Sequence, residues 1–249
     1  MFLRIFPTLV VMLMWAGGVI AQPSVSTELH MVGDKTIELR VTDYGAGHVY
    51  VALHQNEATS VAAAKAVLID QGGVLIELIH GGSRRVHFTL GGVAYDFDPN
   101  RIFSASGIRA TLGAQHSADV ERAVNDLAQT IVRSLPRSSL IVALHNNTDG
   151  RYSAVSYTLG GSYAADASAV TIRDGQDTDN FYFTTDSRWY TLLSNTPYNV
   201  VLQSPSARDD GSLSVYAASA NVPYVNVEAE HGATNAQISM LRSLLSSLN

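Results

Sequence analysis

Three short, mainly apolar segments set the strongest limit on how this chain can fold. They cover residues 48–53, 140–144 and 223–227, and none of them alternates strictly between apolar and polar side chains. Runs of this kind are typical of strands that are buried on both faces, as in the parallel sheets of α/β proteins. We therefore expect a sheet whose central strands are parallel and covered by helices on both sides.

The rest of the sequence supplies the other elements of such a fold. The further predicted elements are strands at 36–41, 74–79 and 198–202, a hairpin around Gly91-Gly92, and helices at 57–70, 117–135, 212–219 and 234–248. Residues 36–41 alternate in polarity, which indicates an edge or half-buried strand. Residues 151–179 are rich in Gly, Ser, Ala and Asp, and we expect loops there. The predicted fold class is α/β, with a mixed, mostly parallel central sheet and helices on both faces.

The first 21 residues have the features of a secretory signal peptide. Arg4 precedes an apolar run at residues 9–15, and Val19-Ile20-Ala21 offers a cleavage site with a small final residue. The apolar run is too short for a stable membrane anchor. We therefore expect a periplasmic or secreted protein in which residues 1–21 are removed and residues 22–249 form a single domain, a common length for an α/β domain.

The composition narrows the classes of function. The chain has no cysteine, so it cannot form disulfides, and any metal must be held by His, Asp or Glu side chains. Its formal net charge is −6 and it has no basic cluster. These features argue against a nucleic-acid partner, which would require a concentration of positive charge.

Histidine and glutamate residues stand at the ends of the three apolar segments. His54 directly follows the first segment, with Glu57 three residues later; His145 follows the second segment and Glu228 the third. In open α/β sheets ligands bind beyond the carboxyl ends of the strands, so we expect these side chains to converge there. Imidazole nitrogens and carboxylate oxygens are good zinc ligands, and a catalytic zinc takes three of them from the protein. The pattern therefore predicts an active site that contains a metal.

Four short motifs extend this pattern over nearly the whole chain after the predicted signal peptide. They are His54-Gln55-Asn56-Glu57, Asp98-Pro99-Asn100-Arg101, Leu144-His145-Asn146-Asn147-Thr148 and Val227-Glu228. In their order and spacing they resemble the aspartoacylase / succinylglutamate desuccinylase branch of the zinc carboxypeptidase superfamily. That branch carries H-G-N-E, D-x-N-R, L-H-N-T and I-E-V-G motifs in the same order.

The resemblance implies a zinc carboxypeptidase-like fold and a role for each metal-site residue. His54, Glu57 and His145 would bind Zn²⁺. Glu228 would take a proton from the attacking water and pass it to the leaving amine, as a general base and then a general acid. Glu230 remains an alternative to Glu228 as the general base.

The resemblance also implies how the substrate would be held. Asn100 and Arg101 would bind a substrate carboxylate, since a guanidinium offers a planar pair of donors that matches a carboxylate. Asp98-Pro99-Asn100 is also a common turn sequence, and a turn would fix the position of Arg101. An arginine is expected to support the oxyanion of the reaction, and both Arg84 and Arg85 are candidates.

The sequence departs from the family motifs at two positions close to the expected metal. Gln55 replaces the glycine of H-G-N-E, which would place a side chain beside the metal. Ala143 stands where the family has an aspartate, two residues before the second zinc histidine. Any contact which that carboxylate makes to a metal ligand must therefore come from elsewhere in the chain.

The expected function is the zinc-dependent hydrolysis of an amide bond in a substrate that carries a carboxylate. Small peptides and N-acyl amino acids fit this description, and a periplasmic address would make peptidoglycan-derived peptides available. One alternative is a non-catalytic metal-binding protein that keeps the fold, although binding zinc does not by itself require Glu228. Another alternative is an esterase or deacylase of acylated sugars or amino acids, which the same groups would serve.

Overall fold

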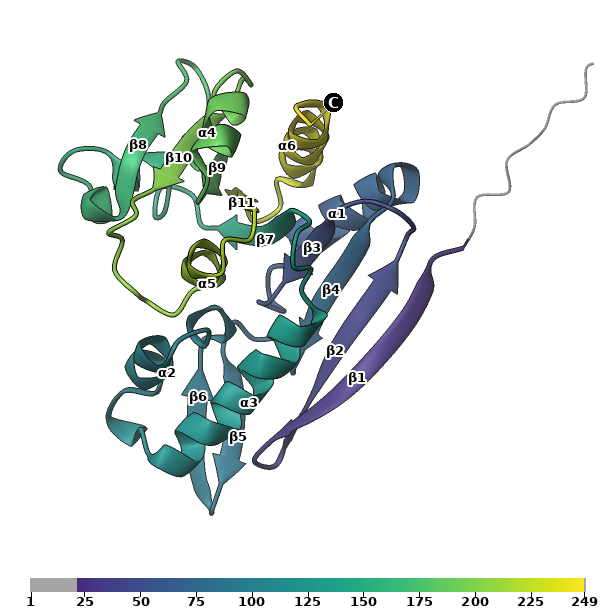
Figure 1. Ribbon diagram of the computed structural model, residues 1–249, viewed down its shortest axis with the longest axis vertical. Coiled ribbons are helices and arrows are strands. Elements are labelled where there is room, and N and C mark those ends of the chain that lie inside the picture. Colours follow the sequence, from purple (N-terminus) through teal and green to yellow (C-terminus); the bar gives the residue numbers. More distant parts are fainter. Residues whose placement is uncertain (1–21, 249) are drawn as a thin grey trace, which may run out of the picture.

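The computed structural model describes residues 22–248, and the predicted signal peptide at residues 1–21 lies outside this range. Within the described residues, nine strands form one sheet that runs through the molecule (Figure 1). In spatial order they are β1 (Ser24–Val32), β2 (Lys35–Asp43), β4 (Val74–Ile79), β3 (Val49–Ala52), β7 (Ile141–Asn147), β11 (Tyr224–Glu230), β9 (Phe181–Thr184), β10 (Asn199–Gln203) and β8 (Ala167–Thr171).

The centre of the sheet is parallel and its flanks are largely antiparallel. The neighbours β4, β3, β7 and β11 all run in the same direction. On one flank β1, β2 and β4 pair antiparallel, and on the other the β11–β9 and β10–β8 pairs are antiparallel. The prediction of an α/β protein with a mixed sheet that is mostly parallel at its centre is confirmed.

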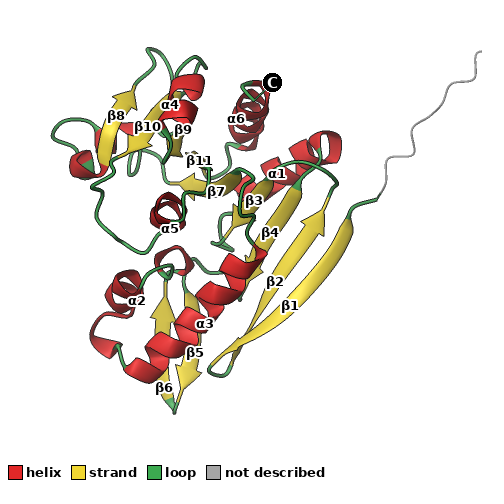
Figure 2. Cartoon of the chain, viewed as in Figure 1, coloured by secondary structure: helices red, strands yellow, loops and turns green. Residues whose placement is uncertain are grey.

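Helices cover both faces of this sheet (Figure 2). One face packs against α1 (Ala58–Gln71), α4 (Ser187–Leu193) and α6 (Thr234–Ser246), and the other packs against α2 (Ala105–Leu112), α3 (Ala118–Ser134) and α5 (Leu213–Ser219). Successive residues of β7 belong alternately to the two cores, with Ala143 on the α3 side and Val142 and Leu144 on the α1 side. A strand between two apolar cores needs apolar residues at every position, which explains the continuous runs in the sequence.

Residues 36–41 fall in β2, in which Ile37 and Leu39 are buried and the residue between them is partly exposed, so the prediction of a half-buried strand is confirmed. The alternative of an edge strand is not, because β1 forms the edge beside it. Two other sequence-based expectations differ from the structure. Residues 151–179 contain two 3₁₀ turns, η3 (Ala154–Tyr157) and η4 (Ala164–Asp166), and the strand β8. The strands β1 and β9 were not expected at all. Among the described residues, no helix has the length and apolar character needed to cross a bilayer.

A small hairpin beside the main sheet leads into the motif Asp98-Pro99-Asn100-Arg101. It consists of β5 (Val86–Leu90) and β6 (Val93–Phe97), joined at Gly91 and Gly92 as predicted. Both glycines have positive φ angles, 60° and 81°, which a two-residue hairpin turn of this kind requires. Directly after β6 the chain forms the 3₁₀ turn η1 (Pro99–Arg101), and Asp98 is the N-cap residue of this turn.

Candidate active site

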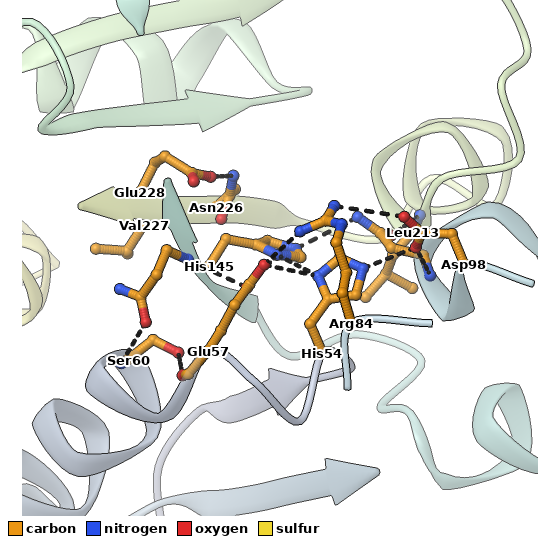
Figure 3. A network of polar contacts seen from close by, with 12 residues as sticks. His54, Glu57, Ser60, Arg84, Asp98, His145, Leu213, Asn226, Val227 and Glu228 are labelled. Carbon is orange, nitrogen blue, oxygen red and sulfur yellow. Dashed lines mark hydrogen bonds and ion pairs between the residues drawn. The ribbon is translucent and has the colours of Figure 1, made fainter. Parts of the chain in front are cut away.

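The three predicted metal ligands, His54, Glu57 and His145, converge at the carboxyl end of the central strands (Figure 3). The Nδ1 atoms of His54 and His145 lie 3.2 Å apart. One carboxylate oxygen of Glu57 lies 3.0 Å from His54 Nδ1 and the other lies 3.0 Å from His145 Nδ1. All three side chains are buried, and their nearest N and O atoms face a common centre. This group could hold a metal ion.

The local structure fixes Glu57 at the point where the chain turns from a strand into a helix. β3 ends at Ala52, a short turn contains His54, and Glu57 is the residue that precedes α1. The amide groups at a helix N-terminus favour a negative charge, so this position stabilises the carboxylate of Glu57. The side chain of Glu57 does not cap α1. Instead Asn146 Oδ1, from β7, accepts a hydrogen bond from the backbone N–H of Ser60 at 2.9 Å.

Each histidine is oriented by a partner on its second ring nitrogen. His54 Nε2 lies 2.7 Å from Asp98 Oδ1, and His145 Nε2 lies 3.3 Å from Asn100 Nδ2. Asp98 is itself held by the backbone N–H of Asn100, which donates to the same oxygen at 2.8 Å. Contacts of this kind fix the orientation of the ring and leave Nδ1 directed toward the common centre. The turn that was predicted to aim Arg101 therefore also orients both histidines.

The side chain of Asn100 has protein partners at both ends of its amide. Its Oδ1 accepts a hydrogen bond from the backbone N–H of Leu213 at 2.9 Å, and its Nδ2 faces His145. The loop that leads to Leu213 comes very close to η1, because Gly211 has no side chain: a Cβ there would lie 2.6 Å from the carbonyl oxygen of Arg101. Whether Asn100 also binds substrate stays a prediction.

The structure distinguishes the two candidate arginines. Arg84 Nη1 donates to Glu57 at 2.7 Å, and its Nη2 lies 3.4 Å from Asp98. Arg85 instead pairs with Asp96 on the hairpin and donates to the carbonyl oxygen of Thr111. Of these two arginines, Arg84 is the one whose side chain contacts the group formed by His54, Glu57 and His145, through Glu57.

Gln55 supports the loop that carries Arg84. Its Oε1 accepts hydrogen bonds from three consecutive backbone N–H groups, those of His80, Gly81 and Gly82, at 2.6–2.8 Å. The expectation that Gln55 places a side chain beside the metal is wrong, because these three donors hold its amide against the β4–β5 loop.

Burial and charge together determine the protonation of the three converging residues. Burial alone would raise the pKa of Glu57, but His145 and His54 outweigh it and hold this pKa well below its usual range. Burial lowers the pKa of His145, against the opposing effect of Glu57. Burial also acts to lower the pKa of His54, but Glu57 and Asp98 together raise it. Metals bind anionic carboxylates and neutral imidazoles, so the charge of Glu57 and the lowered pKa of His145 both suit a metal. Because the Asn100 amide donates to His145 Nε2, the proton of the neutral ring lies on Nδ1, and it must leave that atom when a metal binds there.

Glu228 lies on β11, the strand beside the one that carries His145. In the parallel pairing of β11 and β7, Glu228 stands directly opposite His145. Its side chain is 3% exposed, and Asn226 Nδ2 donates to its Oε2 at 3.0 Å. Burial raises the pKa of Glu228 to about 8, with a further contribution from the negative charge of Glu57. In Figure 3, Glu228 and Asn226 lie on the opposite side of His145 from Asp98.

A cavity of about 410 Å³ connects these groups. Five of the six predicted site residues line it, namely Glu57, Asn100, Arg101, His145 and Glu228. The sixth, His54, is buried and contacts both Glu57 and His145. The cavity wall also includes several residues of the segment 151–179, among them Tyr152, Tyr157 and Tyr163. The structure thus brings together all the side chains that the sequence motifs assign to one site.

Arg101 is partly free and faces this cavity. Its Nη1 donates to the carbonyl oxygen of Asn100 at 2.7 Å, and its Nη2 lies 3.5 Å from Asp210. Its side chain is 37% exposed. Glu230, the alternative to Glu228, does not line the cavity; its carboxylate lies in a separate acidic group with Asp149 and Asp179.

Three contributors were missed as site residues in the sequence, although two of them belong to the motifs. Asp98 was expected only to form a turn, and Asn146 was not assigned any role. Asn226, two residues before Glu228, had no motif to mark it. A signal for Asn226 was nevertheless present, because a polar residue at a buried position of a central strand requires a hydrogen-bond partner.

Comparisons of the sequence with models of protein families and with curated proteins find no match in either set. The geometry of the site and the motifs are therefore the two indications of a function.

Proposed function

We propose that this protein is a zinc-dependent hydrolase of an amide bond, with a fold similar to that of the zinc carboxypeptidases. Its substrate would be a small peptide or an N-acyl amino acid that carries a free carboxylate. The observation that carries the proposal is the meeting of His54, Glu57 and His145 beside a buried Glu228 on one cavity. The features of residues 1–21 favour export, and peptidoglycan-derived peptides would then be an available source of substrate.

The donor set fits zinc. Two His nitrogens and one Glu carboxylate are the protein ligands of several catalytic zinc sites, and such sites keep a fourth position open. With bonds of about 2.0–2.1 Å, two ligands of a tetrahedral zinc lie roughly 3.3 Å apart. The two histidine Nδ1 atoms lie 3.2 Å apart, close to this value, and each lies 3.0 Å from a different oxygen of Glu57. The contact between Asp98 and His54 adds the outer carboxylate that commonly accompanies a zinc-bound histidine.

A bound zinc would supply a Lewis acid that makes water more acidic and polarises the scissile carbonyl. The chain itself supplies the proton transfer: Glu228 accepts a proton from the attacking water and returns it to the leaving nitrogen. The pKa of about 8 for Glu228 suits the second step. A divalent cation nearby would lower this pKa and so favour the carboxylate needed in the first step.

Two arginines would act on the substrate. Arg84 Nη1 lies beside Glu57 and its Nη2 lies beside Asp98, next to the proposed metal ligands. From there the guanidinium can donate to the oxyanion that forms at the scissile carbonyl. Arg101 would bind the substrate carboxylate from across the cavity.

The test of the metal centre is a measurement of stoichiometry. Protein without residues 1–21 should bind close to one zinc per chain, and His145→Ala should abolish this binding. His87→Ala is a matched control, because His87 lies on the exposed side of β5 and does not line the cavity. Full metal retention in His145→Ala would contradict the proposed site.

The test of catalysis compares the two candidate glutamates. Glu228→Gln should keep the zinc but reduce kcat by about 10²–10⁴-fold, the usual contribution of general acid–base catalysis. Glu230→Gln should retain most of the activity. If Glu228→Gln turns over normally, Glu228 is not the base; if wild-type protein binds zinc but hydrolyses no amide, the protein is a metal-binding protein without this activity.

A further inference from the structure

The strand β1 forms one edge of the nine-stranded sheet and has an unpaired backbone along its outer side. It pairs with β2 on one side, and within residues 22–248 no backbone hydrogen bond from another segment reaches its other side. In Figure 1 no described helix, strand or loop lies beyond it. An open edge of this kind can pair with a strand from another chain.

The two edges of the sheet differ in how well they are protected against such pairing. Short edge strands, bulges, lysines and prolines are common ways in which proteins prevent edge-to-edge association. At the far edge, β8 has only five residues, and the register of its pairing with β10 shifts beside Gln203. β1 has nine residues that pair with β2 without a bulge, and none of them is a lysine or a proline. Of the two edges, β1 is therefore the one suited to pairing.

The two faces of β1 have different side chains. Val25, Leu29 and Met31 lie on one face and are 61%, 67% and 56% exposed. Glu28 and His30 lie on the other face, where His30 contacts α3. A partner strand would therefore have to cover an apolar row on one face and to stand beside a carboxylate and an imidazole on the other.

A second copy of β1 meets both requirements in one register. A two-fold axis through the sheet at Leu29 makes the copies antiparallel and keeps each face of β1 on the same side of the joined sheet. On the apolar face, Leu29 then stands opposite Leu29 of the second copy, and Thr27 opposite Met31. On the other face each Glu28 stands opposite His30 of the second copy, so each carboxylate has an imidazole ring as its neighbour.

The neighbouring registers lack this match. An axis at Glu28 places the two Glu28 carboxylates opposite one another, and like charges in that position are destabilising. An axis at Thr27 places each Glu28 opposite Ser26 and loses the pairing with His30. An axis at His30 limits the pairing to residues 28–32 and places Glu28 opposite the apolar Val32. The register centred on Leu29 is therefore the most favourable of the four.

We propose that β1 pairs with β1 of a second copy of this chain, antiparallel and about a two-fold axis at Leu29, so that two sheets join into one continuous sheet. The residues that line the candidate active site lie on other elements, so the inference does not depend on the proposed hydrolysis. One strand from each copy is a small contact compared with the ~800 Å² that each partner buries in a standard interface. The dimer is therefore expected to be weak, with a Kd in the micromolar range.

Sedimentation equilibrium of the protein without residues 1–21, from low micromolar to millimolar concentration, tests the association. We expect a reversible equilibrium between monomer and dimer. Leu29→Lys should raise Kd by about 10-fold or more, because the two copies would then bring two ammonium groups together at the axis. Leu159→Lys is the matched control, because Leu159 is a fully exposed leucine outside β1, and it should leave Kd unaltered. A protein that stays monomeric throughout, or a Leu29→Lys variant that associates like wild type, would overturn the proposal.

The register can be measured by cross-linking, because the chain has no cysteine of its own. In the proposed dimer the two copies of position 29 are adjacent, whereas the two copies of position 25 lie roughly 27 Å apart, at about 3.4 Å per residue. A short bismaleimide should therefore link Leu29→Cys into covalent dimers and leave Val25→Cys unlinked at the same concentration. Equal linkage of the two variants would overturn the register. Dimers in which Leu29→Cys does not link would overturn the pairing through β1.

Discussion

The buried carboxyl group of Glu228 should make the metal-free protein less stable as the pH rises, and Glu228→Gln should remove this effect. Glu228 is 3% exposed, and its one hydrogen bond, from Asn226, satisfies only part of the carboxylate. Burial raises its pKa from 4.5 to about 8. Between these two values the folded protein holds a proton that the unfolded chain releases, so increasing pH favours unfolding.

The size of the effect follows from the two pKa values. Below about pH 4.5 the group is protonated in both states and contributes nothing to the pH dependence. Between this pH and about pH 8, the free energy of unfolding falls by up to ~1.4 kcal/mol per pH unit. The loss would reach roughly 3 kcal/mol at pH 7 and at most about 5 kcal/mol above pH 8, where it is complete. A domain of this size is stable by ~5–15 kcal/mol, so a loss of this order is measurable.

Urea denaturation of chelator-treated protein at several pH values between 5 and 8.5 provides the assay. Glu228→Gln keeps the shape of the side chain and its hydrogen bond from Asn226, so it should match wild type near pH 5 and exceed it increasingly toward pH 8. Asp70→Asn, an exposed change on α1, is the control and should follow wild type throughout. Zinc-loaded wild type should show a smaller decline, because the cation lowers the pKa of Glu228. Parallel stability curves for metal-free wild type and Glu228→Gln would refute the reasoning.

Three further substitutions test other parts of the site. Asp98→Ala should weaken zinc binding by about 10- to 100-fold, because His54 loses the partner of its Nε2, and a competition titration with a chelating dye would measure this; unchanged affinity would exclude an orienting role. Arg84→Gln should lower kcat by about 10²–10³-fold while the zinc content stays near one per chain, as expected for the loss of an oxyanion donor; an unchanged kcat would remove Arg84 from the mechanism. Gln237→Leu should destabilise the protein by about 2–3 kcal/mol in urea denaturation, since its amide bonds to the carbonyl of His145 and to two other buried groups; wild-type stability would contradict this.

The central strands could be predicted because burial on both faces leaves a direct mark on the sequence. β3, β7 and the first part of β11 lie between two cores, and their side chains are almost all buried. β1 has the opposite character: seven of its nine residues are exposed, and the apolar side chains that alternate along it, among them Leu29 and Met31, face solvent. β9 is buried but has four residues, and it follows a segment rich in small and polar residues that resembles a loop. The continuous apolar runs therefore mark the strands that are buried on both faces.

The ligands of the candidate metal centre were predicted by a local rule, whereas their supporting contacts depend on tertiary structure. His54 and Glu57 belong to one turn, and His145 and Glu228 lie on adjacent strands. Asp98 is 44 residues from His54 and reaches it only because the β5–β6 hairpin returns the chain to the site at η1. No pattern within a single segment encodes that return.

Ala143 shows how the local sequence pattern and the tertiary contacts of the site are connected. The side chain at this position belongs to the apolar core between β7 and α3 and is completely buried. An aspartate there would need a buried partner, and a buried carboxylate without one is strongly destabilising. Asp98 provides a carboxylate at the site from a different direction, where Arg84 and the backbone N–H of Asn100 stabilise its charge. The absence of an acidic residue at position 143 is therefore compatible with an oriented histidine pair, because Asp98 contacts His54 from another segment of the chain.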